Sequence, residues 1–191
     1  MKIAIIGNGN VGSGLAGALV RGGHDATAIG RDADIASAVR GADVVVLATP
    51  FGAVADVATA ADFADKIVID VSNPVTEDFS ELQLGHDTSA AEHIAAALPG
   101  ARVVKAFNTI FAQHYGSDLK IAGAPLQTFV ASDDEAARET VMKLATDMGL
   151  AAMNAGALKN ARYLEPIGFM NIQFGYALGQ GVNIAPQWLA A

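Results

Sequence analysis

The fold of this chain is decided by the stretch KIAIIGNGNVG, residues 2–12. Its first half is a short apolar run, typical of a strand that is buried on both faces. Its second half has the spacing G-x-G-x-x-G. An amphipathic segment from Val11 to Arg21 follows and stops at Gly22-Gly23, which predicts a helix. A second strand at residues 26–29 then completes a strand-turn-helix-strand unit.

Each glycine of the motif has a mechanical task in a dinucleotide-binding unit. Gly7 permits a tight turn out of the strand, Gly9 lets the backbone approach a pyrophosphate, and Gly12 lets the helix pack closely on the sheet. The pyrophosphate then lies on the unpaired N–H groups at the start of the helix. A glycine-rich turn in another kind of α/β protein is the alternative, but the flanking strand and helix favour the nucleotide site.

The end of the second strand distinguishes NAD from NADP, because a carboxylate there binds the ribose 2′-hydroxyl and an arginine binds the 2′-phosphate. The sequence reads Gly30-Arg31-Asp32 at this point. Arg31 can grip a phosphate with two charge-assisted hydrogen bonds, and Gly30 leaves room for it. Asp32 is the competing residue, although we expect it to cap the helix that begins near Ala33. The pattern favours NADP(H).

Size and composition indicate one globular domain covering residues 1–191, with a helical tail from about residue 158. Hydrophobic residues make up 52% of the 191 residues, and charged residues make up 17%. The net charge of −8 argues against nucleic acid and anionic membranes as partners. No apolar stretch reaches membrane-spanning length, and residues 1–12 do not resemble a signal peptide. We therefore expect a cytoplasmic protein.

The residue types that usually build metal sites and nucleophilic sites are scarce. There is no cysteine, and the four histidines show no ligand spacing. We predict no metal site. No catalytic triad or carboxylate pair accompanies the nucleotide motif either, so we assign no catalytic residue.

The rest of the chain predicts a doubly wound parallel sheet of the Rossmann type. Further strands are expected at residues 43–48, 66–70, 102–107, 126–131 and 151–153. Ligands in such sheets lie beyond the carboxyl ends of the strands. We therefore expect Thr49, Pro50 and Phe51 to line the nicotinamide cleft, and Asn73 and Asn108 to contact ligand.

Other segments between these strands have structural interpretations. The segment from Gly52 to Phe63 predicts a helix, and Val75 to Asp87 is an irregular stretch of the length typical of a lid or binding loop. Ser89-Ala90-Ala91-Glu92 has the pattern of a capping box, which makes Glu92 structural. Lys105 is interpreted as a solvated strand residue, as is usual for lysine.

The tail is apolar around nearly its whole helical circumference, so its helix must be buried on more than one side. Gly168, Gly175 and Gly179 are unfavourable inside a helix and are expected to permit close helix approach. A homodimer through this helix and an intramolecular core helix are both compatible with the pattern.

These features favour a reaction in which the protein mainly positions the reactants. Hydride transfer between two stacked planar rings is such a reaction, because the cofactors carry the chemistry and the protein sets distance and orientation. The apolar residues Phe107, Phe111 and Met170 favour a site for a second ring.

Five segments resemble the deazaflavin-dependent NADP oxidoreductases, which move hydride between NADPH and coenzyme F420. They are residues 5–12 (IIGNGNVG), 30–31 (GR), 47–50 (LATP), 104–109 (VKAFNT) and 161–166 (ARYLEP). The resemblance implies that Asn8, Gly9, Asn10, Val11, Gly30 and Arg31 hold NADP. It also implies that Thr49 and Pro50 lie beside the nicotinamide, while Asn108 and the neighbourhood of Phe107 face the second ring.

The sequence thus predicts an NADP(H)-dependent oxidoreductase that acts on a small planar acceptor, with coenzyme F420 as the leading one. Two alternatives remain open. One is an NADPH-dependent flavin or ferric/cupric reductase, similar to the cytosolic domain of six-transmembrane metalloreductases. The other is a non-enzymatic NADP(H)-binding redox sensor.

Overall fold

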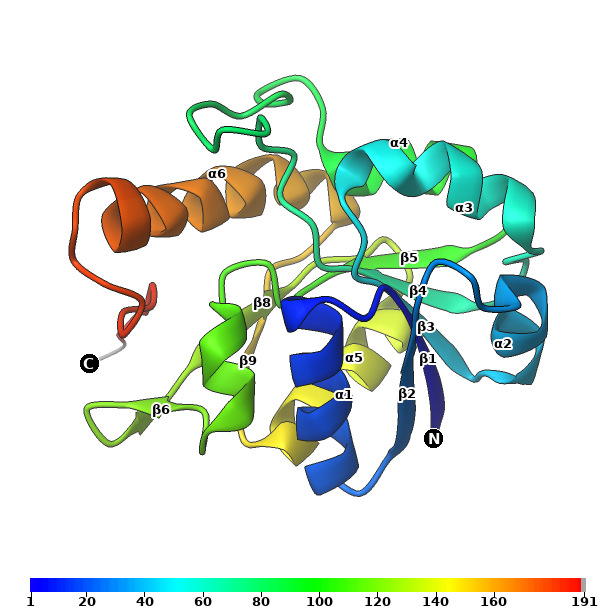
Figure 1. Cartoon of the computed structure of the whole chain (residues 1–191), viewed down its shortest axis with the longest axis horizontal. Helices are drawn as coiled ribbons and strands as arrows, with labels where there is room; N and C mark the ends of the chain where they lie inside the picture. Colours follow the sequence, from blue (N-terminus) through cyan, green and yellow to red (C-terminus); the bar gives the residue numbers. More distant parts are fainter. Residues whose placement is uncertain (190–191) are drawn as a thin grey trace.

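The computed structural model describes residues 1–189 and is organised around a sheet of five parallel strands in the order β2-β1-β3-β4-β5 (Figure 1). These strands are β1 (Lys2–Ile6), β2 (Asp25–Ile29), β3 (Val44–Leu47), β4 (Ile67–Asp70) and β5 (Arg102–Lys105). Because β2 and β3 pair with opposite sides of β1, the strand order reverses at β1. Ligands in open α/β sheets bind at the carboxyl ends of the strands beside such a point.

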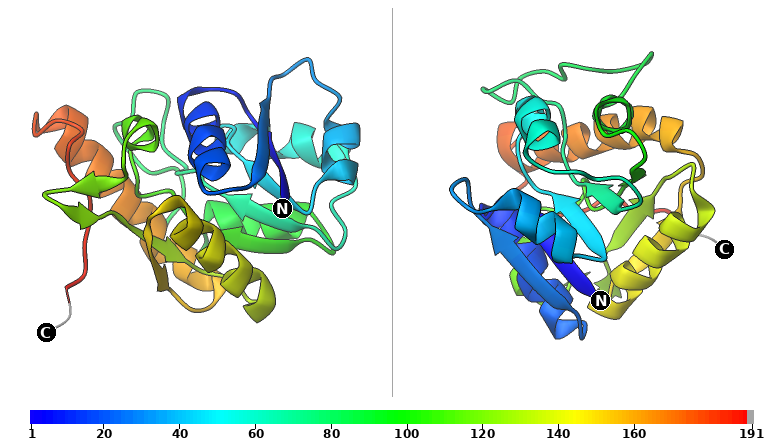
Figure 2. Two further views of the ribbon diagram at one scale, coloured as in Figure 1. Left: turned by 90° about the horizontal axis from the view of Figure 1, so that it is seen from below. Right: turned by 90° about the vertical axis from the view of Figure 1, so that its right-hand side faces the viewer.

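Within residues 1–189, six α-helices surround the sheet. They are α1 (Asn10–Arg21), α2 (Ile35–Gly41), α3 (Val54–Ala60), α4 (Ala90–Ala97), α5 (Glu135–Met148) and α6 (Ala161–Ile172). Helices α1 and α5 cover one face, and α3 and α4 cover the other (Figure 2). Alternate strand residues supply the two cores: Ile3 and Ile5 pack with α1 and α5, whereas Ala4 and Ile6 pack with α2 to α4. The predicted doubly wound Rossmann fold is confirmed.

A second strand pair lies beyond β5. Strands β8 (Gln127–Val130) and β9 (Ala151–Asn154) pair in parallel, with α5 as their crossover. Lys105 and Ala131 exchange two backbone hydrogen bonds of 2.8 and 3.0 Å in an antiparallel bridge, which ties the pair to β5. A small hairpin of β6 (Lys120–Ile121) and β7 (Ala124–Pro125) precedes β8.

In the described part of the chain, three short 3-10 helices connect the main elements: η1 (Phe51–Ala53), η2 (Ala112–Gly116) and η3 (Leu158–Asn160). The helix expected from Gly52 to Phe63 is shorter and consists of part of η1 followed by α3.

Two helix caps test the sequence interpretation. The N-cap of α2 is Asp34, whose Oδ1 accepts a hydrogen bond of 2.9 Å from the Ser37 N–H, so the assignment of that role to Asp32 was wrong. Ser89 is the N-cap of α4, as the predicted capping box requires, and its Oγ accepts a hydrogen bond of 3.2 Å from the Glu92 N–H. The Glu92 carboxylate accepts from Ser89 Oγ at 2.7 Å, in place of the Ser89 N–H that a full capping box would use.

The C-terminal segment contributes little to the two main cores: Ala161 of α6 belongs to one, and Ala185 packs against the other. Helix α6 continues into a π-helical turn, η4 (Gln173–Ala177), and the chain then turns back along the molecule (Figure 1). Near its end, Trp188 packs edge-on against Phe129 with ring centres 5.3 Å apart. Gln127 and the Trp188 backbone also exchange hydrogen bonds of 2.7 and 2.8 Å. The helical tail predicted for residues 158–191 therefore ends near Ala177, and its last two residues lie outside the described part.

Within residues 1–189, no helix has both the length and the apolar character that crossing a bilayer requires.

Candidate functional site

The G-x-G-x-x-G turn joins β1 to α1, and its three glycines face different surroundings. Gly7 has φ +111°, and a Cβ there would lie 2.4 Å from the Ala48 carbonyl oxygen at the end of β3. A Cβ on Gly12 would lie 1.8 Å from the Gly7 carbonyl oxygen. A Cβ on Gly9 would meet nothing within 4 Å. The fold therefore requires the outer two glycines, whereas the middle one leaves space for something that approaches from outside.

The start of α1 is suited to an anion. Its N-cap is Gly9, no side chain caps it, and no acidic residue lies in its first turn. Ser13 Oγ donates a 2.8 Å hydrogen bond to the Asn8 carbonyl and so stabilises the turn. The first N–H groups of a helix have no intrahelical acceptor, and the helix dipole adds partial positive charge there.

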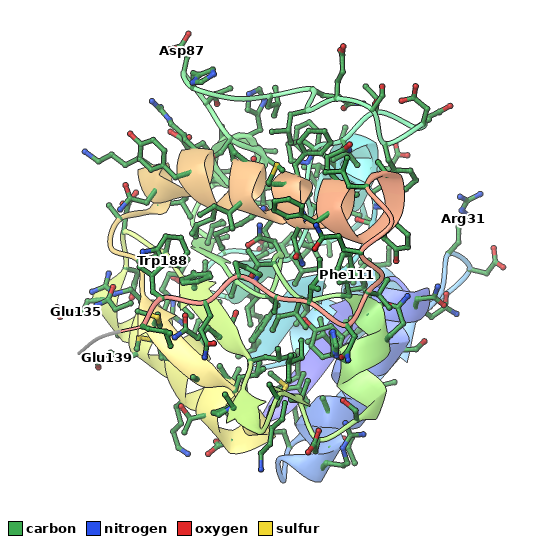
Figure 3. All side chains as sticks on the ribbon, turned by 90° about the vertical axis from the view of Figure 1, so that its left-hand side faces the viewer. Arg31, Asp87, Phe111, Glu135, Glu139 and Trp188 are labelled. Atoms are coloured by element: carbon green, nitrogen blue, oxygen red, sulfur yellow. The ribbon has the colours of Figure 1, made fainter. Side chains whose placement is uncertain are left out.

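Gly30 and Arg31 follow β2 and lie beside this turn. A Cβ on Gly30 would lie 2.9 Å from Asn8 Nδ2, so the two segments are in close contact. Arg31 is exposed and projects away from the body of the molecule (Figure 3). Because the Asp34 carboxylate caps α2, it is held within its own turn. Arg31 is thus a cation at the position where the sequence predicts a 2′-phosphate.

A cleft of about 710 Å³ opens next to the turn, and Asn10 and Val11 of α1 form part of its wall. The other described lining residues are Val71, Asn73, Asp78, Phe79, the segment 107–113, Gly168, Asn171, Ile172, Tyr176 and Ala177. The cleft thus lies between the carboxyl ends of β4 and β5 on one side and α6 with η4 on the other. Most of the lining is apolar, which suits a planar ring.

Asn73 and Asn108 face each other at the base of the cleft. Asn73 Nδ2 donates to the Asn108 carbonyl at 2.8 Å, and Asn108 Nδ2 donates to Asn73 Oδ1 at 2.9 Å. Asn108 Nδ2 also donates to the Leu164 carbonyl of α6 at 2.9 Å. A Cβ on Gly168 would lie 2.5 Å from Asn73 Oδ1. Gly168 therefore permits the predicted close approach of α6, and this approach is to the asparagine pair.

The other two glycines of the tail, Gly175 and Gly179, have different structural roles. A Cβ on Gly175 would lie 2.6 Å from the Phe111 ring, so Gly175 lets η4 close against the cleft wall. Gly179 has φ +70° and no atom within 4 Å of its Cβ position. Gly179 thus serves a turn, and the expectation that it permits helix approach was wrong.

Phe107 has a strained backbone at the cleft wall. Its φ is +64°, although it is a bulky residue and is buried. Two buried side chains hold this conformation: the Phe107 N–H donates to Thr128 Oγ1 at 3.1 Å, and the Tyr115 hydroxyl donates to the Phe107 carbonyl at 3.3 Å. Burial raises the pKa of Tyr115, which keeps this hydroxyl a donor. Strain of this kind is concentrated at ligand sites.

A buried charged cluster lies behind the cleft. Lys105 Nζ is 2.7 Å from Asp70 Oδ2 and 2.9 Å from Glu165 Oε1, and all three residues are at most 1% exposed. The interpretation of Lys105 as a solvated residue was wrong, because its neighbour in register on β4 is Asp70. In the sequence, the signal for the Asp70–Lys105 pair was that two adjacent apolar strands end in opposite charges. No local sequence pattern pointed to Glu165.

Glu165 connects this cluster to two helices. It lies on α6, and its carboxylate accepts hydrogen bonds from the Ala90 and Ala91 N–H groups at the start of α4, at 2.9 and 3.2 Å. Burial raises the pKa of Glu165 more than Lys105 and the Ala90 N–H lower it. Arg162, one turn earlier on α6, binds the Glu92 carboxylate through two hydrogen bonds of 2.6 and 2.8 Å. This contact lowers the pKa of Glu92. Polar groups therefore fix α6, and with it one wall of the cleft.

The loop from Val75 to Asp87 reaches the mouth of the cleft, as Asp78 and Phe79 are among its lining residues. Gln173 Nε2 in η4 donates to the Phe79 carbonyl at 2.8 Å and holds the loop against the C-terminal segment. Sequence reasoning identified this loop but missed Asp78, Phe79 and Asn171. Asn171 could have been found as a single amide within the apolar helix, whereas Asp78 and Phe79 have no such signal.

Not all predicted site residues lie on the cleft wall. Of the fourteen, Asn10, Val11, Asn73, Phe107 and Asn108 line the cleft, and the glycine motif with Gly30 and Arg31 adjoins it. Thr49, Pro50 and Phe51 follow β3 beside Gly7 but are not part of the lining. Phe51 packs edge-on against His93 of α4, with ring centres 5.8 Å apart.

No group of three or more histidine, aspartate or glutamate side chains within residues 1–189 is arranged to hold a metal ion.

Comparison with known proteins identifies the family. The family described as "NADP oxidoreductase coenzyme F420-dependent" matches residues 31–74. A solved structure from Arthrobacter sp. FB24, provisionally described as an F420-dependent NADP reductase, is 30% identical with a TM-score of 0.86, and 96% of each chain is covered.

Other known proteins match part of the chain or share its fold. Metalloreductase STEAP3 of Rattus norvegicus is 35% identical over 102 residues, which are 53% of this chain and 20% of that protein. This chain thus matches about a fifth of the length of that relative. A reductive aminase from Aspergillus terreus, solved with NADPH, is 16% identical with a TM-score of 0.67 over 93% of this chain and 62% of that one, and shares the fold alone. The near full-length match at 30% identity decides the assignment, and the chain belongs to the F420-dependent family of NADP oxidoreductases.

Proposed function

We propose that the chain transfers hydride between NADPH and a planar acceptor bound in the cleft, with coenzyme F420 as the leading acceptor. The observation that carries this proposal is that Asn10 and Val11 belong both to the first turn of α1, directly after the glycine-rich turn, and to the cleft wall. A dinucleotide held at the start of α1 would therefore extend directly toward the space where a second ring fits. The family to which the chain belongs supports the same reaction.

The residues around the turn fit the parts of NADP. The α1 N-terminus would bind the pyrophosphate, with Gly9 leaving it room, and Arg31 would bind the 2′-phosphate. Thr49, Pro50 and Phe51 follow β3, next to β1, and would lie along the path toward the nicotinamide. Asn73, Phe107 and Asn108 would contact the ring stack inside the cleft. Residues Gly7, Asn8, Asn10, Val11, Gly12 and Gly30 would complete the nucleotide site.

This arrangement needs no protein nucleophile. The nicotinamide supplies the hydride, and the protein brings the donor and acceptor rings to about 3–3.5 Å in a dry cleft. Phe107, Ile110, Phe111 and Ile172 would help to exclude water there, because they are apolar residues of the cleft lining. The strained Phe107 backbone fixes one wall, and Gly168 sets how closely α6 forms the other.

A second candidate function is reduction of flavin or of ferric or cupric chelates. The 35% identity to a metalloreductase over half of this chain supports it. Both candidates use the same nucleotide site and differ in the acceptor.

Anaerobic oxidation of NADPH by the purified protein tests the proposal and separates the candidates. F420, FMN, FAD and ferric chelates would be compared as acceptors, with NADH as the alternative donor. Fast turnover with F420 would support the first function, and turnover with flavin or iron only would support the second. Tight NADPH binding without turnover in any assay would contradict both and favour a sensor.

The cofactor assignment has a separate test in Arg31. Replacing Arg31 by alanine should weaken NADPH binding about 10- to 100-fold, the value of a charge-assisted hydrogen-bond pair, and leave NADH binding nearly unchanged. Arg40→Ala is the matched control, because it removes the same charge from the last turn of nearby α2. Equal losses for NADPH and NADH in Arg31→Ala would contradict the assignment.

We also propose that the chain forms a homodimer through α6. Tyr163, Met170 and Phe174 follow the spacing i, i+7, i+11 and are 66%, 44% and 37% exposed, so they form one apolar stripe. Sedimentation of the wild type and of Met170→Glu would test this, with a dimer expected only for the wild type. A monomeric wild type would contradict it.

A further inference from the structure

We propose that Phe79 is a binding residue for the acceptor, because a turn at the mouth of the cleft holds its aromatic ring in place to stack on a planar acceptor ring. The inference rests on the proposed hydride transfer and assigns a further residue of the same site. It predicts that an acceptor with a flat aromatic ring gains affinity from this residue.

The backbone of Phe79 has a conformation that bulky residues avoid. Its φ is +59°, in the left-handed region where glycine and asparagine are common and a large side chain is an outlier. Tight turns that need this conformation usually have glycine. Hydrogen bonds fix both backbone groups: the Phe79 N–H donates to the Thr76 carbonyl at 2.9 Å, and the Phe79 carbonyl accepts from Gln173 Nε2 at 2.8 Å. A phenylalanine at this position therefore costs stability.

Burial offsets this kind of cost at other bulky residues but not at Phe79. Within residues 1–189, the non-glycine residues with positive φ are Asp65, Phe79, His86, Phe107, Leu119 and Ala122. Aspartate and histidine tolerate this region, and alanine is small. Phe107 and Leu119 are 3% and 2% exposed, so packing offsets the strain there, whereas Phe79 is 57% exposed. The core of the protein therefore does not explain why position 79 has a large aromatic side chain.

A network of hydrogen bonds holds the turn that presents Phe79. Asp78 Oδ1 accepts from Thr76 Oγ1 at 2.6 Å, from Ser80 Oγ at 2.8 Å and from the Ser80 N–H at 3.1 Å. The bond from Thr76, followed by those from Ser80, lowers the pKa of Asp78 to about 2, so this carboxylate is ionised at neutral pH. The Glu81 N–H donates to Thr76 Oγ1 at 3.1 Å and closes the turn. The turn is thus held in one shape at the surface of the molecule.

The exposed Phe79 is part of the cleft lining. Tyr176 of η4 also lines the cleft and is 59% exposed, whereas the two other aromatic residues of the described lining, Phe107 and Phe111, are buried. Tyr176 packs edge-on against Phe111, with ring centres 5.4 Å apart. Gln173, which binds the Phe79 carbonyl, lies on the same η4. A planar ring bound in the cleft would therefore cover aromatic surface that is exposed in the structure, and aromatic stacking favours such contacts.

The strain and the exposure of Phe79 have one explanation in common. Unfavourable backbone conformations persist at ligand sites where they present a side chain to the ligand. A ring that is already held in place loses little conformational freedom when a ligand stacks on it. Relief of the strain should consequently increase the stability of the protein and weaken acceptor binding. A residue with only a structural role would not change these two properties in opposite directions.

The test replaces Phe79 by asparagine, which adopts a positive φ readily and has no aromatic ring. We expect Phe79→Asn to raise the midpoint of urea unfolding by about 0.5 M as the strain is released. Binding of F420 and of FMN, measured from quenching of their fluorescence with NADP⁺ present, should weaken about tenfold, the size of one aromatic stacking contact. The dissociation constant of NADPH should be unchanged.

Two control variants separate the ring from the backbone. Phe79→Tyr keeps both the ring and the strain, so it should retain wild-type stability and wild-type acceptor binding. Ala122→Asn relieves a φ of +51° in the turn between β6 and β7, and Ala122 does not belong to the cleft lining. It should also raise the unfolding midpoint but leave acceptor binding unchanged.

The outcomes distinguish this inference from the proposed function. Unchanged or tighter acceptor binding in Phe79→Asn would overturn the inference and leave hydride transfer intact, and so would an equal loss of NADPH affinity. A loss of acceptor affinity together with a fall in stability would show that Phe79 only holds the cleft together, which also overturns it. Failure of the wild type to bind either F420 or FMN would do the same. The expected changes in binding, without NADPH oxidation by the wild type, would support Phe79 as the aromatic contact and contradict the proposed reaction.

Discussion

The two ends of the cleft are built in different ways. At the proposed nucleotide end, three glycines within six residues shape a turn at the end of β1, and the backbone N–H groups at the start of α1 would form the phosphate site. At the proposed acceptor end, the walls come from segments far apart in the chain. A buried ion cluster and an asparagine pair hold α6 to β4 and β5. The first end depends on local backbone geometry, and the second depends on side chains that meet only in the folded protein.

This difference implies that substitutions at the two ends should affect stability and ligand binding in different ways. At the nucleotide end, a loss of stability and a loss of nucleotide binding should arise from different glycines. A side chain on Gly12 would clash with backbone, whereas a side chain on Gly9 would enter open space. At the acceptor end, stability and ligand geometry depend on the same polar groups, so they should change together.

The largest expected effect is at Gly12. Gly12→Ala would place a Cβ 1.8 Å from the Gly7 carbonyl oxygen, which neither β1 nor α1 can accommodate without moving. We expect a loss of more than about 4 kcal/mol in the free energy of unfolding, among the largest that one substitution causes. Urea unfolding followed by circular dichroism would measure it.

Gly9→Val is the matched variant for this position. Gly9 has φ −70° and ψ −170°, which valine adopts readily, and its Cβ would meet nothing. The variant should keep wild-type stability within about 1 kcal/mol and lose affinity for NADPH and NADH alike, because the Cβ would fill the pyrophosphate site. Retained affinity would exclude this turn as the phosphate site.

The next largest effect is at Lys105. Lys105→Met would leave Asp70 and Glu165 buried without their cation, which typically costs about 3–5 kcal/mol. Adding Asp70→Asn and Glu165→Gln to this variant should recover much of the loss, because the remaining groups would then be neutral. The three substitutions would be compared by urea unfolding in a mutant cycle. Additive losses would show that the three groups do not act as one cluster.

The difference between the two ends of the cleft also explains how much of the structure could be predicted from the sequence. The doubly wound parallel sheet, the turn and the carboxyl-end position of Asn73 and Asn108 were predictable, since each rests on a local pattern and one rule of sheet topology. The role of Lys105 was not, because Glu165 lies 60 positions away and only the packing of α6 brings it close. The start of α2 was misplaced for a simpler reason: Asp32 and Asp34 both suit an N-cap, and in the structure the capping hydrogen bond from the Ser37 backbone N–H goes to Asp34.

A smaller effect is expected at Gly168. Gly168→Ala would put a Cβ 2.5 Å from Asn73 Oδ1 and 2.9 Å from Asn108 Nδ2, so either the asparagine pair or α6 must shift. Overpacking of this kind costs about 1–3 kcal/mol. Acceptor binding should weaken while NADPH binding is retained, which titrations with each ligand would measure. Gly41→Ala is the control, because its Cβ would meet nothing within 4 Å. Equal loss of both ligands would show that the two ends are not independent.

The smallest effect concerns the pH dependence of Glu165. Its pKa is raised by burial above the usual 4.5, so the folded protein keeps a proton that the unfolded chain has released. Stability from this group is therefore complete below pH 4.5 and declines as the pH rises through the raised pKa, by at most about 1.4 kcal/mol per pH unit. Glu165→Gln cannot titrate. The unfolding free energy of the wild type minus that of Glu165→Gln should consequently fall as the pH rises from 4 to 7.

The pH dependence of this difference distinguishes a Glu165 that titrates with a raised pKa from a glutamate that acts only through its hydrogen bonds. Glutamine would place an amide donor against either the Ala90 or the Ala91 N–H, so the variant should also lose a constant amount at every pH. Glu139→Gln on the exposed face of α5 is the control and should show neither the slope nor the offset (Figure 3). An offset without a slope would mean that Glu165 holds α6 through its hydrogen bonds alone. In that case the acceptor end, like the nucleotide end, would be fixed independently of pH.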